Sequence, residues 1–128
     1  MRITFGQSVQ IPGRVLPPGT YIFQRRIAGV GADENWVQIT KADSDRVVAF
    51  VQTVPATRRN ISGDIELTFA TNLEGQPPAL VAWSLPGSLG GYEFLYARRI
   101  ERRIEKEQHV EVAANSRNEI LIPTLAGD

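Results

Sequence analysis

Few side chains in this 128-residue chain have the chemistry of catalysis or metal binding. The chain has one histidine, His109, and no cysteine, which excludes disulfides and thiolate ligands and leaves a zinc site dependent on carboxylates. Glu66 and Glu93 form the carboxylate pair to consider, because a glycosidase needs two such groups at a defined separation. Both lie in predicted strands, where glutamates commonly occupy the solvated face. We therefore predict no enzymatic activity, no metal and no cofactor.

Aromatic side chains on predicted strands are better candidates for function. In "NWVQIT", Trp36 lies on the opposite strand face from the apolar Val37. Tyr92 and Tyr96 share a face in "GYEFLYA", and Trp83 lies in "ALVAWSL". Exposed flat rings on a sheet suit stacking on sugar rings, so these four aromatic residues are candidates for binding a carbohydrate or another small ligand. The alternative is that they belong to the core.

A second candidate surface lies near the end of the sequence. The apolar segment "ILIPTL" at 120–125 follows the polar "ANSRNE", and Pro123 within it cannot donate to a strand ladder. The segment therefore suits an added edge strand, paired either with its own domain or with the edge of a neighbouring copy. Under the second alternative, its aliphatic side chains would mediate self-association: Ile120, Leu121, Ile122 and Leu125.

Charge and hydropathy exclude two classes of partner. Lys and Arg total 14, as do Asp and Glu, so no long-range field of one sign favours nucleic acid. No apolar run approaches the roughly 18 residues of a membrane span, and we predict no membrane insertion.

The elements that position these residues are short runs of β-branched and aromatic residues separated by Gly, Pro, Asn and Asp. The runs are "ITFGQSVQI", "GTYIFQRRI", "NWVQITKA", "RVVAFVQTV", "DIELTFA", "ALVAWSL" and "YEFLYAR". Their spacing predicts a mainly β fold, an antiparallel β-sandwich or barrel of about seven to eight strands. "RVVAFVQTV" alternates less clearly and is interpreted as a central strand covered on both faces. The prolines and glycines of "IPGRVLPPGTY" predict turns rather than a binding loop.

One segment has a helical pattern. "ARRIERRIEKEQ", residues 97–108, contains strong helix formers and places Ile100 and Ile104 one turn apart, which predicts a short C-terminal helix lying on the sheet. "HVEVAA" follows as a final strand. The organisation is therefore a single β domain over 1–113 and an extended tail over 114–128.

Several phrases resemble an uncharacterised family of small secreted bacterial β-domain proteins. They are "VQIPGRVLPPGTYIF", "NWVQI", "VPATR" and "LTFATNLEGQPPALVAWSLPGSLGGYEFLYARR", which together cover about residues 3–108. The chain differs from the family pattern at Pro18, at Ser84-Leu85 and at Ala97. The resemblance implies a secreted or periplasmic β domain and no activity. We expect a structural or self-assembling component of the cell exterior; the alternative is a binding module that uses surface aromatics.

Overall fold

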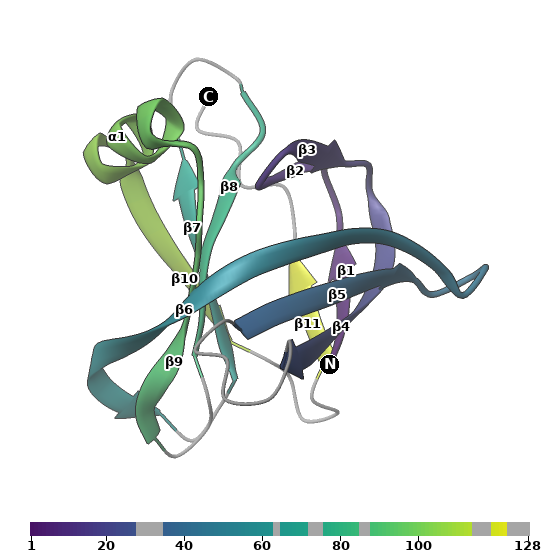
Figure 1. The fold of residues 1–128 in the computed structure, drawn as a ribbon, viewed down its shortest axis with the longest axis horizontal. Helices are drawn as coiled ribbons and strands as arrows, with labels where there is room; N and C mark the ends of the chain where they lie inside the picture. Colours follow the sequence, from purple (N-terminus) through teal and green to yellow (C-terminus); the bar gives the residue numbers. More distant parts are fainter. Residues whose placement is uncertain (28–34, 63–64, 72–75, 85–87, 114–118, 123–128) are drawn as a thin grey trace.

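The computed structural model describes residues 1–27, 35–62, 65–71, 76–84, 88–113 and 119–122. Over these ranges the chain is mainly β, with one short helix, which confirms the predicted fold class (Figure 1). The elements are β1 (Arg2–Phe5), β2 (Val9–Ile11), β3 (Arg14–Leu16), β4 (Gly19–Ile27), β5 (Asn35–Lys41), β6 (Arg46–Ser62), β7 (Glu66–Thr71), β8 (Ala79–Ser84), β9 (Ser88–Phe94), α1 (Arg98–Lys106), β10 (Gln108–Ala113) and β11 (Glu119–Ile122).

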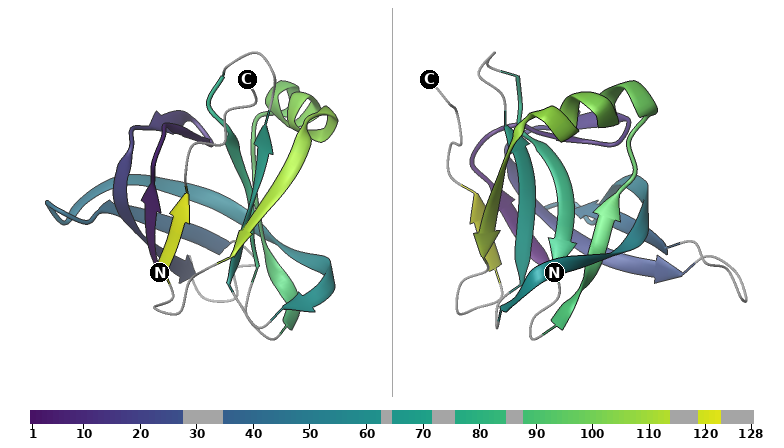
Figure 2. Two further views of the ribbon diagram at one scale, coloured as in Figure 1. Left: turned by 180° about the vertical axis from the view of Figure 1, so that it is seen from behind. Right: turned by 90° about the vertical axis from the view of Figure 1, so that its left-hand side faces the viewer.

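The described strands form one sheet in the order β10-β7-β8-β9-β6-β5-β4-β1-β11. All neighbours along this path are antiparallel except β1 and β11, which are parallel. The β2–β3 hairpin branches from the path and meets β8 through a single pair, Gln10 and Ala79. The sheet curves around a shared interior, with the long β6 crossing in front of the other strands in Figure 1 and α1 beside the upper ends of β7 and β10 (Figure 2).

More strands are present than the seven to eight predicted, because some runs divide and others were not recognised. "ITFGQSVQI" is two strands, β1 and β2, with residues 6–8 between them. The three-residue β3 is too short to show a period in the sequence. The strand over 19–27 has the bounds of its predicted run, and "HVEVAA" corresponds to β10.

The first Pro- and Gly-rich stretch consists of turns, as predicted. Pro12 and Gly13 connect β2 to β3, and Ile11 pairs with Arg14 across them. Gly13 has φ +84°, so the pair fits a type II turn, which takes proline first and a positive-φ glycine second. Gly19 opens β4 with φ +153°, a conformation that L side chains rarely adopt. Backbone geometry therefore explains the presence of glycine at both positions, and no role in ligand binding is needed.

Aromatic rings fill the middle of the core. Phe5 on β1 is 1% exposed, and its ring centroid lies 5.8 Å from that of Tyr21, 6.2 Å from that of Phe23 and 6.3 Å from that of Phe69. Around them pack buried aliphatic side chains from β1 to β8, including Ile3, Val9, Ile11, Leu16, Val37, Ile39, Val51, Leu67 and Leu80. Because every strand from β1 to β9 contributes to this cluster, the sheet encloses one core.

Helix α1 lies on the sheet through its isoleucines. Ile104 is 5% exposed and packs with Ala70, Ala79 and Val81, and Ile100 packs against the same cluster. A hydrogen bond fixes the helix further, because the Arg103 guanidinium donates to the side-chain oxygen of Gln10 at 2.7 Å. The helix therefore fastens the β2–β3 branch to the end of the sheet near β7 and β8.

Tyr96 reinforces this junction just before the helix. Its hydroxyl donates to the Leu80 carbonyl oxygen at 2.7 Å and also lies 3.1 Å from the Gln10 carbonyl oxygen. Burial raises the pKa of Tyr96 above its ordinary value of 10.0, against the smaller opposing effects of Arg103 and of the bond to Leu80. The folded chain therefore holds the phenolic proton more tightly than the unfolded chain does.

We predict that this difference appears as a pH dependence of stability. The contribution of Tyr96 is complete below pH 10 and decreases as the pH rises above 10, because the unfolded chain then releases a proton that the folded chain retains. Melting temperatures measured between pH 8 and 11.5 should fall less steeply for Tyr96→Phe than for the parent chain. A slope equal to the parent's would contradict the prediction. Tyr21, whose pKa is also raised by burial, accounts for part of the remaining slope.

Candidate functional site

The alternation in β5 places Trp36 on the outside of the sheet. Val37 and Ile39 are fully buried in the core, as the sequence pattern predicts. Trp36 and Gln38 therefore point to the other face, where both are half-buried. Trp36 is absent from the core cluster that holds Trp83, so the two tryptophans of the chain have different environments.

Strand register groups six side chains around this position. Trp36 pairs with Arg26 on β4 and with Gln52 on β6, forming one row across three strands. The next row on the same face, two residues further along β5, consists of Gln24, Gln38 and Phe50. We call these six residues the Trp36 face: Gln24, Arg26, Trp36, Gln38, Phe50 and Gln52. In each row an aromatic ring lies beside a glutamine. Trp36 and Phe50 are diagonal neighbours in adjacent rows, a separation that long side chains can bridge.

Hydrogen bonds orient the polar members of the Trp36 face. The Arg26 guanidinium donates to the side-chain oxygens of Gln38 and of Gln24, each at 3.3 Å. The Gln38 amide nitrogen in turn donates to the Thr40 hydroxyl at 3.2 Å. An arginine that uses two of its five N–H donors in this way retains others for a ligand.

The exposure of Phe50 corrects the interpretation of β6. "RVVAFVQTV" was interpreted as covered on both faces, but Phe50 is 56% exposed and Val54 is 37% exposed. The prediction is wrong because only one face of β6 meets the core, through Val51 and Thr53, while the other continues the outer surface of the sheet. Phe50 is therefore the site residue that the sequence reasoning missed. Strand alternation could have identified it, because Phe50 precedes Val51, and adjacent residues of a strand point to opposite faces.

The other candidate aromatics face inward. Trp83 and Tyr92 are 8% and 9% exposed, and their ring centroids lie 6.1 Å apart. The Arg25 guanidinium lies 4.9 Å from the centroid of the Tyr92 ring, a cation–π contact over the ring face. Tyr96 packs against the same interior. The structure therefore places Trp83 and Tyr92 together as buried neighbours, while the partly buried Tyr96 packs against the core near Leu80 and Gln10.

The apolar tail pairs within its own chain. Ile120, Leu121 and Ile122 lie in β11 and pair in parallel with Ile3, Thr4 and Phe5 of β1. Leu125 lies outside the described residues. In the single chain this segment therefore forms an edge strand of its own sheet, and pairing with a neighbouring copy stays a prediction.

The described residues form no metal-ligand cluster, although Glu93, His109 and Glu111 line one hollow of about 220 Å³. No group of three or more His, Asp or Glu side chains within them is arranged to hold a metal ion. Glu66 lies on β7 and Glu93 on β9, with β8 between them, so their strands are about 10 Å apart. His109 is exposed, and its Nε2 lies 3.0 Å from the Ile104 carbonyl oxygen. No helix in the described part of the chain has the length and hydropathy to cross a membrane.

Comparison of the chain with protein-family models, with curated proteins and with solved structures finds no match. The function is therefore inferred from the chain's own residues. Among these, the Trp36 face combines partly exposed rings with oriented polar groups.

Proposed function

We propose that this protein is a non-enzymatic, exported binding module that holds a carbohydrate on the Trp36 face. The observation that carries the proposal is the pairing of two outward rings, Trp36 and Phe50, with three glutamines and Arg26 on adjacent strands. Export rests on the family resemblance of the sequence.

The chemistry of the Trp36 face matches that of a sugar. A pyranose ring has apolar C–H faces that pack on flat aromatic rings and a rim of hydroxyls that donate and accept hydrogen bonds. Amide side chains provide both functions, and a guanidinium provides donors only. The rings and the amides stand on rigid paired strands, which lowers the entropy lost when a ligand binds.

The single-chain geometry favours this function over self-assembly through the tail. β11 already pairs with β1 of the same chain, so an assembly through that segment would first require this pairing to open. The Trp36 face needs no rearrangement, because Phe50 is 56% exposed in the chain as it stands. Carbohydrate binding would also account for the contact that the half-buried indole of Trp36 and the exposed phenyl ring of Phe50 keep with water.

A glycan array probed with the full chain tests the proposal. We expect retention on a subset of glycans, and Trp36→Ala should reduce it at least tenfold while leaving the melting temperature nearly unchanged, because Trp36 is outside the core cluster. Phe50→Ala should weaken binding to the same glycans. Val15→Ala provides the matched control, since Val15 is 47% exposed on β3, away from the Trp36 face, and its removal should leave retention intact.

Two outcomes would count against the proposal. One is an array without retention on any glycan, and the other is retention that Trp36→Ala and Phe50→Ala leave unchanged. Unfolding of Trp36→Ala would instead show that the indole supports the fold, and Phe50→Ala then decides alone.

A further inference from the structure

A hollow lined by cations lies at the end of the molecule where β3, β4, β5 and β6 meet. Its volume is about 260 Å³, and its lining residues come from β3 and the Pro-rich turn, and from the facing ends of β5 and β6. They are Arg14, Leu16, Pro17, Tyr21, Lys41, Arg46, Val47 and Val48. It is remote from Trp36, which stands at the opposite end of β5 on the outer face.

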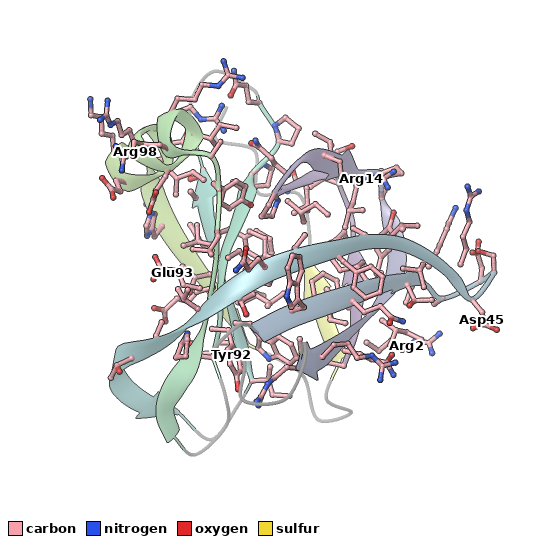
Figure 3. The ribbon with its side chains drawn as sticks, viewed as in Figure 1. Arg2, Arg14, Asp45, Tyr92, Glu93 and Arg98 are labelled. Atoms are coloured by element: carbon pink, nitrogen blue, oxygen red, sulfur yellow. The ribbon has the colours of Figure 1, made fainter. Side chains whose placement is uncertain are left out.

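The charged side chains that line the hollow are of one sign. Arg14, Lys41 and Arg46 line it, and no carboxylate does. Asp43 and Asp45 lie in the β5–β6 turn, with Asp45 at the tip of that hairpin and away from Arg14 in Figure 3. Within the described residues, neither Lys41 nor Arg46 forms an ion pair within 4.0 Å. In a chain whose formal net charge is zero, this is a local concentration of positive charge, and Asp43 is the nearby carboxylate, close enough to add to the effect of burial in raising the pKa of Tyr21 in the lining.

One of the three cations is held in place. The Arg14 guanidinium donates through Nη1 to the Val48 carbonyl oxygen on β6, across the hollow from its own strand. Arg14 follows the Pro12-Gly13 turn directly, so the hairpin geometry also fixes where its side chain begins. The Tyr21 hydroxyl is engaged with the Pro17 carbonyl oxygen at 2.7 Å, which closes the inner wall. The Arg14 guanidinium is thus held in position, and its remaining N–H donors are available to a ligand.

The rest of the lining is apolar. Leu16 is buried at the base, while Val47 is 43% exposed and Val48 is half-buried beside it. One exposed and one half-buried valine beside cations suit a ligand with an acidic head group and a hydrocarbon body. The valines would cover the hydrocarbon while the cations pair with the acid, and charge-assisted hydrogen bonds of that kind are about twice as strong as neutral ones.

We propose that this hollow binds a small organic anion, a carboxylate or phosphate attached to a short apolar body. Arg14, Lys41 and Arg46 bind the head group, and Val47 and Val48 contact the body. This site is separate from the Trp36 face, and its existence does not depend on carbohydrate binding there.

The test is an NMR titration of the full-length ¹⁵N-labelled chain with hexanoate, hexyl phosphate and uncharged hexanol. The two anions should shift the amide signals of residues 14–16 and 46–48, and hexanol at the same concentration should not. The double variant Lys41→Gln/Arg46→Gln should lower affinity for both anions by about tenfold or more. The matched control Arg98→Gln/Arg99→Gln removes the same charge from exposed positions of α1 and should leave the affinity unchanged. Trp36→Ala should also bind both anions normally.

The comparison of the two anions identifies the preferred head group, because tighter binding of hexanoate indicates a carboxylate ligand and tighter binding of hexyl phosphate indicates a phosphate ligand. The proposal is overturned if neither anion produces shifts at residues 14–16 and 46–48, or if hexanol produces equal shifts. Equal affinity in the two double variants would also overturn it, because binding would then follow total charge rather than this cluster.

Discussion

Gly91→Ala is expected to destabilise the chain by about 2–3 kcal/mol, the upper part of the usual range for overpacking a tightly packed site. A Cβ atom on Gly91 would lie 2.6 Å from the Trp83 carbonyl oxygen and 3.0 Å from the Cα of Ser84. Both contacts are with backbone, so no side-chain rotation relieves them. The pairing of Gly91 with Ser84, which joins β9 to β8, would have to open. Urea denaturation measured by circular dichroism gives the change in unfolding free energy.

Gly13→Asn separates the steric effect from the loss of glycine's conformational freedom. Gly13 has a positive φ, but no heavy atom lies within 4 Å of its added Cβ, and asparagine tolerates this backbone region. We expect this control to change stability by no more than about 0.5 kcal/mol. An unfolding midpoint for Gly91→Ala equal to that of the parent would show that β8 and β9 can separate without cost.

Phe5→Ala should cost about 3–5 kcal/mol, the usual loss for a fully buried phenylalanine. Its ring contacts Tyr21, Phe23 and Phe69, so its removal leaves a cavity where rings from three other positions meet. Because small domains are stable by only about 5–15 kcal/mol, the variant should be partly unfolded at moderate urea concentrations.

Phe50→Ala is the matched control for this substitution, because it removes the same ring from a position that is 56% exposed. We expect a change within about 0.5 kcal/mol. If the two variants lost equal stability, Phe50 would be part of the packed structure, and its assignment to the Trp36 face would fail. The control thus also supports the use of Phe50→Ala in the binding experiment.

Local patterns were sufficient for much of the fold. A two-residue period with flanking glycines located β4 at its observed bounds, and the spacing of Ile100 and Ile104 located α1 to within two residues of its ends. The pattern failed at β3, where three residues carry too little periodicity. It failed also at β6, where a nearly continuous apolar run is compatible with burial on one face or on both.

The site was only partly predictable for a different reason. Alternation alone placed Trp36 opposite the buried Val37. The neighbours of Trp36 depend on pairing register, which brings Arg26 and Gln52 beside it from separate strands, and register is not encoded within any one strand. Alternation groups Tyr92 with Phe94, but the pairing of β9 with β8, which sets Tyr92 beside the buried Trp83, is what shows that this face of β9 is the buried one.

The parallel pairing of β1 with β11 has a consequence for the order of folding. Arg2 pairs with Glu119, so this contact closes a loop of nearly the whole chain, whereas the β4–β5 and β5–β6 pairs join strands that are adjacent in sequence. Contacts between distant residues are slow to form because chain entropy is lost before they are made. During synthesis on the ribosome, the β4–β5–β6 meander is complete while β1 still lacks its outer partner. The edge of β1 therefore stays open to other strands until the last part of the sheet has been translated.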